Sequence, residues 1–169
     1  MAAGSTYTPI ATTTLGSNAN SVTFSSISGA YTDLVLICAN LGAQSAQTIY
    51  VQANSDTGTN YSFTYLNGNG SVVQSSRSSN NSQGFVIGGS VAGLPASIGA
   101  VGTLQIQNYS NTTTYKTALS RYGAASAETQ VGASLWRSTS AINALKVYAS
   151  SGTLILAGAT FTLYGITAA

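Results

Sequence analysis

The sequence contains no histidine and very few charged residues. Only five Lys/Arg and three Asp/Glu occur among 169 residues, a charged fraction of 5%, against about 25% in ordinary soluble domains. General acid–base catalysis most often uses histidine, and a serine nucleophile needs a neighbouring base, so most enzyme mechanisms lack their usual groups here. One cysteine without histidine also cannot supply the ligands of a zinc site. We therefore expect no catalytic, metal-binding or cofactor-binding residues, and no cofactor.

Disulfides, long apolar runs and a targeting segment are missing as well. Cys38 is the only cysteine, so no disulfide can form within the chain, which is typical of a reducing compartment. It lies in the apolar run Leu34–Ala39, where a buried side chain is expected rather than a reactive thiol. That run has six residues, whereas a membrane span needs about 18 or more. Residues 1–8 lack the basic and apolar regions of a signal peptide, so we expect no membrane partner and folding in a cytoplasm.

The few basic residues are scattered along the chain. They are Arg77, Lys116, Arg121, Arg137 and Lys146. Nucleic-acid-binding proteins gather Lys and Arg on one face, because affinity comes from neutralising phosphates, so no nucleic-acid partner is expected. A surface with so little charge does not repel a second copy of the chain, which favours association between subunits.

Hydroxyl-bearing and β-branched residues are abundant instead. The chain has 25 Ser and 22 Thr, yet 44% of its residues are hydrophobic, which argues against disorder. Apolar and polar residues alternate in several segments, as expected for strands with one face in a core. The apolar positions of these segments are Ile49, Val51, Ala53, Leu104, Ile106, Leu145, Val147, Ala149, Phe161 and Leu163. The run Leu34–Ala39 is apolar in both phases and predicts a central strand covered on both faces.

These segments, with turn residues between them, predict one all-β domain over residues 1–169. The expected fold is a single-domain, jelly-roll-like antiparallel β-sandwich of about ten strands. The expected strands are 7–15, 21–27, 33–40, 48–54, 61–67, 84–91, 101–109, 115–123, 129–136, 142–150 and 153–166, the last of which Gly158 can break. Residues 67–83, rich in Ser, Asn and Gly, are expected to form a long exposed loop. Residues 1–10, which include Pro9, suit an N-terminal arm or an edge strand.

Few groups remain that can carry chemistry. The acidic residues are Asp33, Asp56 and Glu128, and glycoside hydrolysis would need two of them across one bond. The spacing Asn54-x-Asp56-x-Gly58-x-Asn60 is similar to a calcium loop, but a single carboxylate without a terminal glutamate favours a turn. Aromatic side chains can bind sugars, although they are more typical of sheet edges and subunit contacts. The aromatic candidates are Tyr50, Tyr65, Tyr109, Tyr115, Tyr122, Trp136 and Tyr148.

Several motifs, in their order along the chain, resemble a family of virion structural proteins of tailed bacteriophages. They are Val22–Ile27 (VTFSSI), Tyr31–Leu34 (YTDL), Asp56–Ser62 (DTGTNYS), Ile106–Thr117 (IQNYSNTTTYKT), Trp136–Ile142 (WRSTSAI) and Phe161–Ile166 (FTLYGI). The resemblance runs from about Ser21 to the C-terminus and brings no catalytic residues with it.

The resemblance implies a structural role in the virion. The first hypothesis is a capsid decoration or cement protein, a jelly-roll homotrimer that binds the major capsid protein on the outer capsid surface. An N-terminal arm would then contact a neighbouring subunit, and its interface candidates are Tyr7, Thr8, Pro9 and Ile10. The alternative is a tail or fibre module that binds host surface glycan through exposed aromatic residues or residues 67–83.

Overall fold

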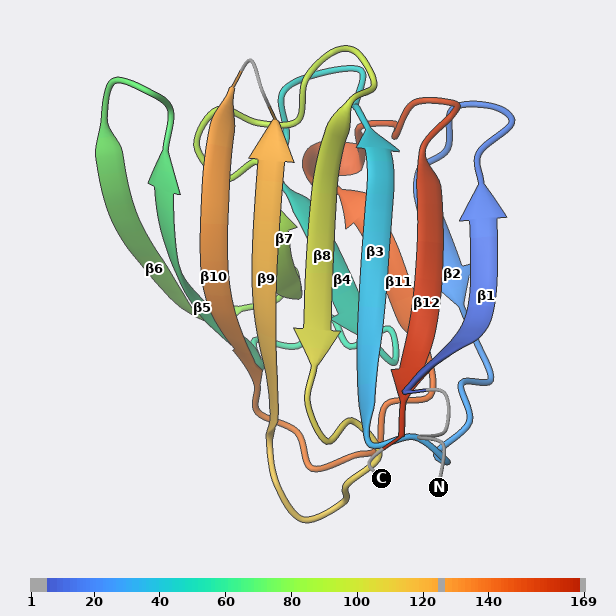
Figure 1. The fold of residues 1–169 in the computed structure, drawn as a ribbon. Coiled ribbons are helices and arrows are strands. Elements are labelled where there is room, and N and C mark those ends of the chain that lie inside the picture. The colour runs from blue at the N-terminus through green and yellow to red at the C-terminus, as the bar shows by residue number, and fades with distance from the viewer. Residues whose placement is uncertain (1–5, 125–126, 168–169) are drawn as a thin grey trace.

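Residues 6–124 and 127–167 are described in a computed structural model, and they form two antiparallel β-sheets stacked face to face (Figure 1). The large sheet consists, in spatial order, of β1 (Tyr7–Thr14), β12 (Thr160–Ile166), β3 (Asp33–Leu41), β8 (Ala100–Ile106), β9 (Lys116–Ala124), β10 (Glu128–Trp136), β5 (Tyr61–Gly68) and β6 (Val73–Asn81). The small sheet consists of β2 (Ser21–Phe24), β11 (Leu145–Ala149), β4 (Ile49–Ala53) and β7 (Phe85–Gly88). The predicted all-β sandwich is confirmed.

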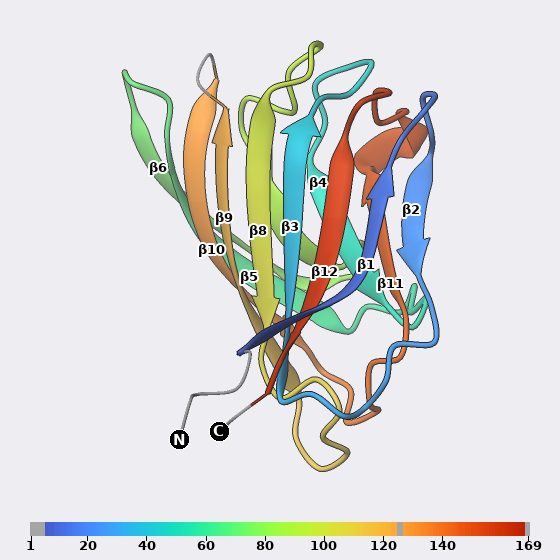
Figure 2. The same cartoon turned by 45° about the vertical axis from the view of Figure 1, so that its right-hand side comes forward.

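Eight of the twelve strands pair as in a jelly roll. When β5, β6, β9 and β10 are left aside, one sheet reads β1-β12-β3-β8 and the other β2-β11-β4-β7. In each sheet the strand that comes first in the chain therefore lies beside the strand that comes last, β1 beside β12 and β2 beside β11. This is the nested pairing of two Greek keys. The other four strands extend the large sheet beyond β8, so the large sheet reaches well past the small one (Figures 1 and 2).

The core lies between the two sheets and is lined by the apolar phase of the alternating strands. Val51 of β4, Val147 of β11 and Leu163 of β12 are fully buried, as the alternation predicts. Cys38 is also fully buried, and burial raises the pKa of its thiol far above the ordinary value. The fold therefore agrees with the prediction that Cys38 is buried and is not a reactive thiol.

Three details differ from the sequence-based expectations. Residues 67–83 are not an irregular loop, because Val73–Asn81 form the edge strand β6, whose backbone pairs with β5 although its side chains face solvent. The described residues form twelve strands rather than about ten. The β3 run is central in its sheet, but its outer face is covered only in part, since Val35 is buried there while Ile37 is 40% exposed.

The large sheet curls around the free edge of β7. Tyr50 and Val86 point away from the core on the small sheet, yet they are buried against Phe63 and Tyr65 of β5. The ring centroids of Tyr50 and Phe63 are 6.2 Å apart. This second aromatic cluster holds the β5–β6 extension to the sandwich. Among the described residues the only helix is the short 3-10 turn Ser150–Gly152, and none is long and apolar enough to cross a membrane.

Candidate assembly surface

The outer face of the large sheet exposes large apolar side chains from six strands. Side chains alternate along a strand, so residues between the core positions point away from the small sheet. Within the described residues nothing packs on this face as a further layer. The exposed apolar side chains, each 40–54% accessible, are Tyr7, Ile37, Leu66, Val101, Leu119 and Val131. Large apolar side chains gathered on one exposed face are typical of interaction sites.

Strand pairing arranges this face in rows that cross the sheet. One row contains Thr162, Ile37, Thr103, Arg121, Val131 and Leu66, from β12 to β5. The adjacent row contains Tyr164, Val35, Gln105, Leu119, Ala133 and Thr64. Directly opposite residues have Cβ atoms about 4.5–5.5 Å apart, so each row forms a continuous strip of side chains. The strips mix apolar groups with hydroxyls and amides.

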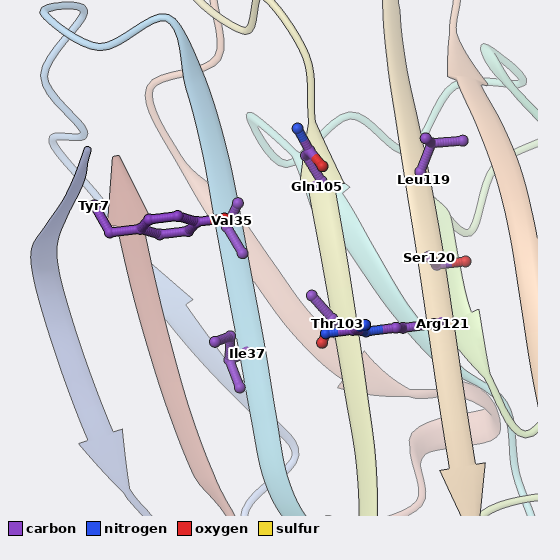
Figure 3. A pocket seen from close by; sticks show the side chains of 8 residues that line it. All are labelled: Tyr7, Val35, Ile37, Thr103, Gln105, Leu119, Ser120 and Arg121. Carbon is purple, nitrogen blue, oxygen red and sulfur yellow. The ribbon is translucent and has the colours of Figure 1, made fainter. Parts of the chain in front are cut away.

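A shallow hollow lies at the β1 side of this face (Figure 3). Figure 3 shows the Tyr7 side chain extending over β12 toward Val35. The Tyr7 ring meets Tyr164 edge-on, with ring centroids 6.1 Å apart. From the other side, Arg121 extends from β9 toward Thr103 on β8 (Figure 3). The hollow is therefore bordered by an aromatic pair and one cation.

The outer face carries little charge. In the described part of the chain its charged side chains are Arg77, Arg121 and Asp33. The Asp33 carboxylate accepts hydrogen bonds from the backbone N–H of Asn108 at 2.8 Å and from Gln105 Nε2 at 3.3 Å. Donors of the same chain therefore bind both of its oxygens. Two copies, or a copy and a neutral partner, can approach such a face without strong repulsion.

The face is large enough for a stable interface. Eight strands spaced about 4.8 Å apart, and about seven residues long at 3.3 Å per residue, span about 780 Å². A standard protein–protein interface buries about 800 Å² on each partner. The area of the outer face therefore matches what one stable contact requires.

The four predicted interface residues lie in the edge strand β1. Tyr7, Thr8 and Pro9 pair with β12 of the same chain, and Ile10 packs on the core. Residues 7–10 thus form an edge strand, the second of the two forms that the sequence allowed, and their contact with a neighbouring subunit stays a prediction. Residues 1–5 of the expected arm lie outside the described residues.

The calcium-like spacing forms a hydrogen-bonded turn between the sheets. Asp56 accepts hydrogen bonds from Gly58 N (2.7 Å), Asn60 Nδ2 (2.9 Å) and Trp136 Nε1 (2.6 Å). Both carboxylate oxygens are therefore occupied by donors of the protein. The Asn54 side chain is also engaged, because its Oδ1 accepts from the backbone N–H of Asn143 at 2.9 Å. This segment connects β4 to β5 and is not arranged to hold a metal.

Most of the aromatic candidates for sugar binding are buried. Tyr50, Tyr65, Tyr109, Tyr122 and Trp136 are each no more than 8% exposed, and Tyr148 is partly buried. Only Tyr115 presents a largely open ring, with 54% exposure. An aromatic platform on one face is thus not assembled from these residues.

The acidic residues are not brought together for catalysis. Asp56 is bound to Trp136 at the end of β10, while Glu128 begins the same nine-residue strand. At about 3.3 Å per residue the backbones of Glu128 and Trp136 are about 26 Å apart, so the two carboxylates lie toward opposite ends of β10, whereas glycosidases hold theirs about 5–10 Å apart. Lys116 is fully buried, and its Nζ donates to the carbonyls of Thr114 (2.8 Å) and Thr139 (3.3 Å). Burial lowers the pKa of Lys116.

Sequence reasoning did not single out the residues of the outer face. The signal was present, because Leu66, Leu119 and Val131 occupy the solvent phase of strands whose opposite phase forms the core. An apolar residue in both phases of an antiparallel strand predicts a second covered face. The sequence matches no protein-family model and no curated protein.

Proposed function

We propose that this protein is a virion structural protein that acts by assembly: a capsid decoration or cement protein that binds the major capsid protein as a homotrimer on the outer surface of a phage head. The outer face of the large sheet carries the proposal. It offers about 780 Å² by the strand dimensions above, has exposed apolar side chains on six strands, and bears little charge. The motifs that resemble tailed-phage virion proteins are the reason for proposing that the protein belongs to a phage particle.

The mechanism of such a protein is mechanical. Surface buried across the junctions between capsid subunits must be re-exposed before the shell can rupture, which raises the barrier to rupture. Hydroxyl and amide side chains between the apolar ones can hydrogen-bond across the contact. Such a contact depends little on charge, so it also depends little on salt.

A first experiment tests the outer face as a contact surface. The Val131→Asp substitution places a charge on the outer face, directly opposite the exposed Leu66, whereas Val72→Asp makes the same change at an exposed turn between β5 and β6. We expect sedimentation velocity to show an oligomer for the wild type and for Val72→Asp, and a monomer for Val131→Asp. A monomeric wild type, or an oligomer that survives Val131→Asp, would show that this face is not the self-contact.

A second experiment tests the location. Gold-labelled antibody against the chain is applied to intact virions of the phage that encodes it and imaged by electron microscopy. Label distributed over the head is the expected result. Label confined to the tail or its tip would exclude a decoration protein and direct the protein to a glycan-binding screen.

A further inference from the structure

Five buried polar atoms gather at one place between the sheets without a hydrogen-bond partner. Within the described residues these are Asn67 Oδ1, Ser90 Oγ, Tyr122 Oη, Glu128 Oε1 and Gln130 Nε2. Natural proteins contain few such atoms, and each one needs an explanation. That all five come from one neighbourhood points to a common cause.

Strand register explains why these atoms lie together. Asn67 on β5 is directly opposite Gln130 on β10, and Gln130 is directly opposite Tyr122 on β9. All three face the core, with Cβ atoms of opposite pairs about 4.5–5.5 Å apart. Glu128 lies two residues from Gln130 and therefore on the same face. Its Oε2 accepts from Asn67 Nδ2 at 3.1 Å.

The loop that follows β7 closes the cluster. Ser90 N donates to Gln130 Oε1 at 3.3 Å, and Ala92 N donates to Glu128 Oε2 at 3.1 Å. These bonds fix one end of each side chain and leave the other end unpaired. A surface hollow lies beside this loop and is lined by Ala92 and by Ala127, the chain neighbour of Glu128.

Glu128 carries the only acidic group of the cluster. It is 2% exposed, and one of its oxygens receives two donors while the other receives none. In the described residues no Lys or Arg partner neutralises it. A buried carboxylate without a counter-charge is strongly destabilising.

We propose that this cluster is a cation site that takes a hard divalent ion, Ca²⁺. Glu128 Oε1 is the charged ligand, and Asn67 Oδ1 and Ser90 Oγ are neutral oxygen ligands. Ca²⁺ accepts six to eight oxygen ligands in flexible geometry, including water. Gln130 Nε2 and the Tyr122 hydroxyl, which can both donate, then bond to the water ligands. An all-oxygen set with one carboxylate selects calcium over transition metals and predicts weak, millimolar binding.

Thermal unfolding tests the site directly. We expect 10 mM CaCl₂ to raise the Tm of the wild type by about 3–6 °C over NaCl of equal ionic strength, as follows from a Kd of about 1 mM and the size of the domain. Glu128→Gln removes the charge but keeps the shape, and its Tm should not respond. Asp56→Asn removes a carboxylate elsewhere and should keep the full calcium response. A wild type whose Tm does not respond to calcium, or a Glu128→Gln variant that responds equally, overturns the proposal.

Two further measurements hold even if Glu128→Gln fails to fold. Tb³⁺ in place of Ca²⁺ should show luminescence on excitation of tyrosine, because Tyr122 borders the site, and Ca²⁺ should displace it. Asn67→Asp adds a second carboxylate, so it should lower the Tm in EGTA and enlarge the response to calcium. Absence of displaceable Tb³⁺ luminescence, or an Asn67→Asp variant with no greater calcium response, counts against the site.

Discussion

The Asp56 carboxylate is the group whose removal we expect to destabilise the fold most clearly. It joins the β4–β5 connection to the end of β10 by accepting from Trp136 Nε1 at 2.6 Å. Trp136 is 2% exposed and stacks on Tyr61, with ring centroids 6.2 Å apart and an interplanar angle of 18°. Gly58 N and Asn60 Nδ2 occupy the remaining acceptor positions of Asp56. Asp56→Ala removes all three bonds at once.

The expected loss follows from the burial of each donor. The indole N–H is left unpaired in a buried position, which costs about 1–3 kcal/mol, and the two other donors can turn to water at about 0.5 kcal/mol each. The total is about 2–4 kcal/mol. At about 2–4 °C per kcal/mol for a domain of this size, Asp56→Ala should lower the Tm by about 4–16 °C.

Urea unfolding followed by tryptophan fluorescence is the appropriate assay, because Trp136 is the only tryptophan and reports on this contact. Asn60→Ala is the matched control, since it removes one donor and keeps the bond between Trp136 and Asp56; its cost should stay below about 1 kcal/mol. The reasoning is refuted if Asp56→Ala costs less than about 0.5 kcal/mol and leaves the native emission of Trp136 unchanged.

The same carboxylate gives the fold a dependence on acid. Burial alone would raise the pKa of Asp56, but the hydrogen bonds from Trp136, Asn60 and Gly58 outweigh it and lower the pKa below 3.8. The stabilisation is therefore present above the ordinary value and is lost as pH falls through the lowered one. We expect the free energy of unfolding of the wild type to fall below about pH 4 and that of Asp56→Ala to change less.

Three further predictions concern the core. Gly88→Ala would place a Cβ 2.1 Å from Tyr122 Cγ, so it should cost about 1–3 kcal/mol or more, while Gly123→Ala, with no atom within 4 Å, should be nearly neutral in urea unfolding. Equal costs for the two would contradict the close packing. Burial raises the pKa values of Tyr122 and Tyr148 to about 12, so stability is complete below the ordinary value of 10.0 and is lost as pH rises toward 12. Absorbance at 295 nm should show these two ionising only with unfolding. Cys38, 0% exposed, should not react with a thiol reagent until the protein unfolds, and fast reaction of the native protein would show that the core opens.

Much of the fold could be predicted because strand periodicity is local. In β11, Leu145, Val147 and Ala149 alternate with polar residues, and the alternation by itself assigns them to the core. Val73–Asn81 escaped prediction because this strand is exposed on both faces and has no apolar phase. The position of β6 depends on backbone pairing with β5, and the side-chain pattern of the strand does not indicate this pairing.

The sequence by itself determined most of the strand-forming segments and the burial of Cys38, because composition and alternation act over a few residues. Only the tertiary structure decided which apolar side chains of the large sheet pack against the small sheet and which remain on its uncovered face. Ile37 and Leu119, about 80 residues apart in the chain, come to share one uncovered face because β8 pairs with β3 on one side and with β9 on the other. The pairing of β10 with β5 on one side and with β9 on the other places Asn67, Tyr122 and Glu128 near one another. Register across strands is a long-range property, and it created both the uncovered outer face and the buried polar cluster.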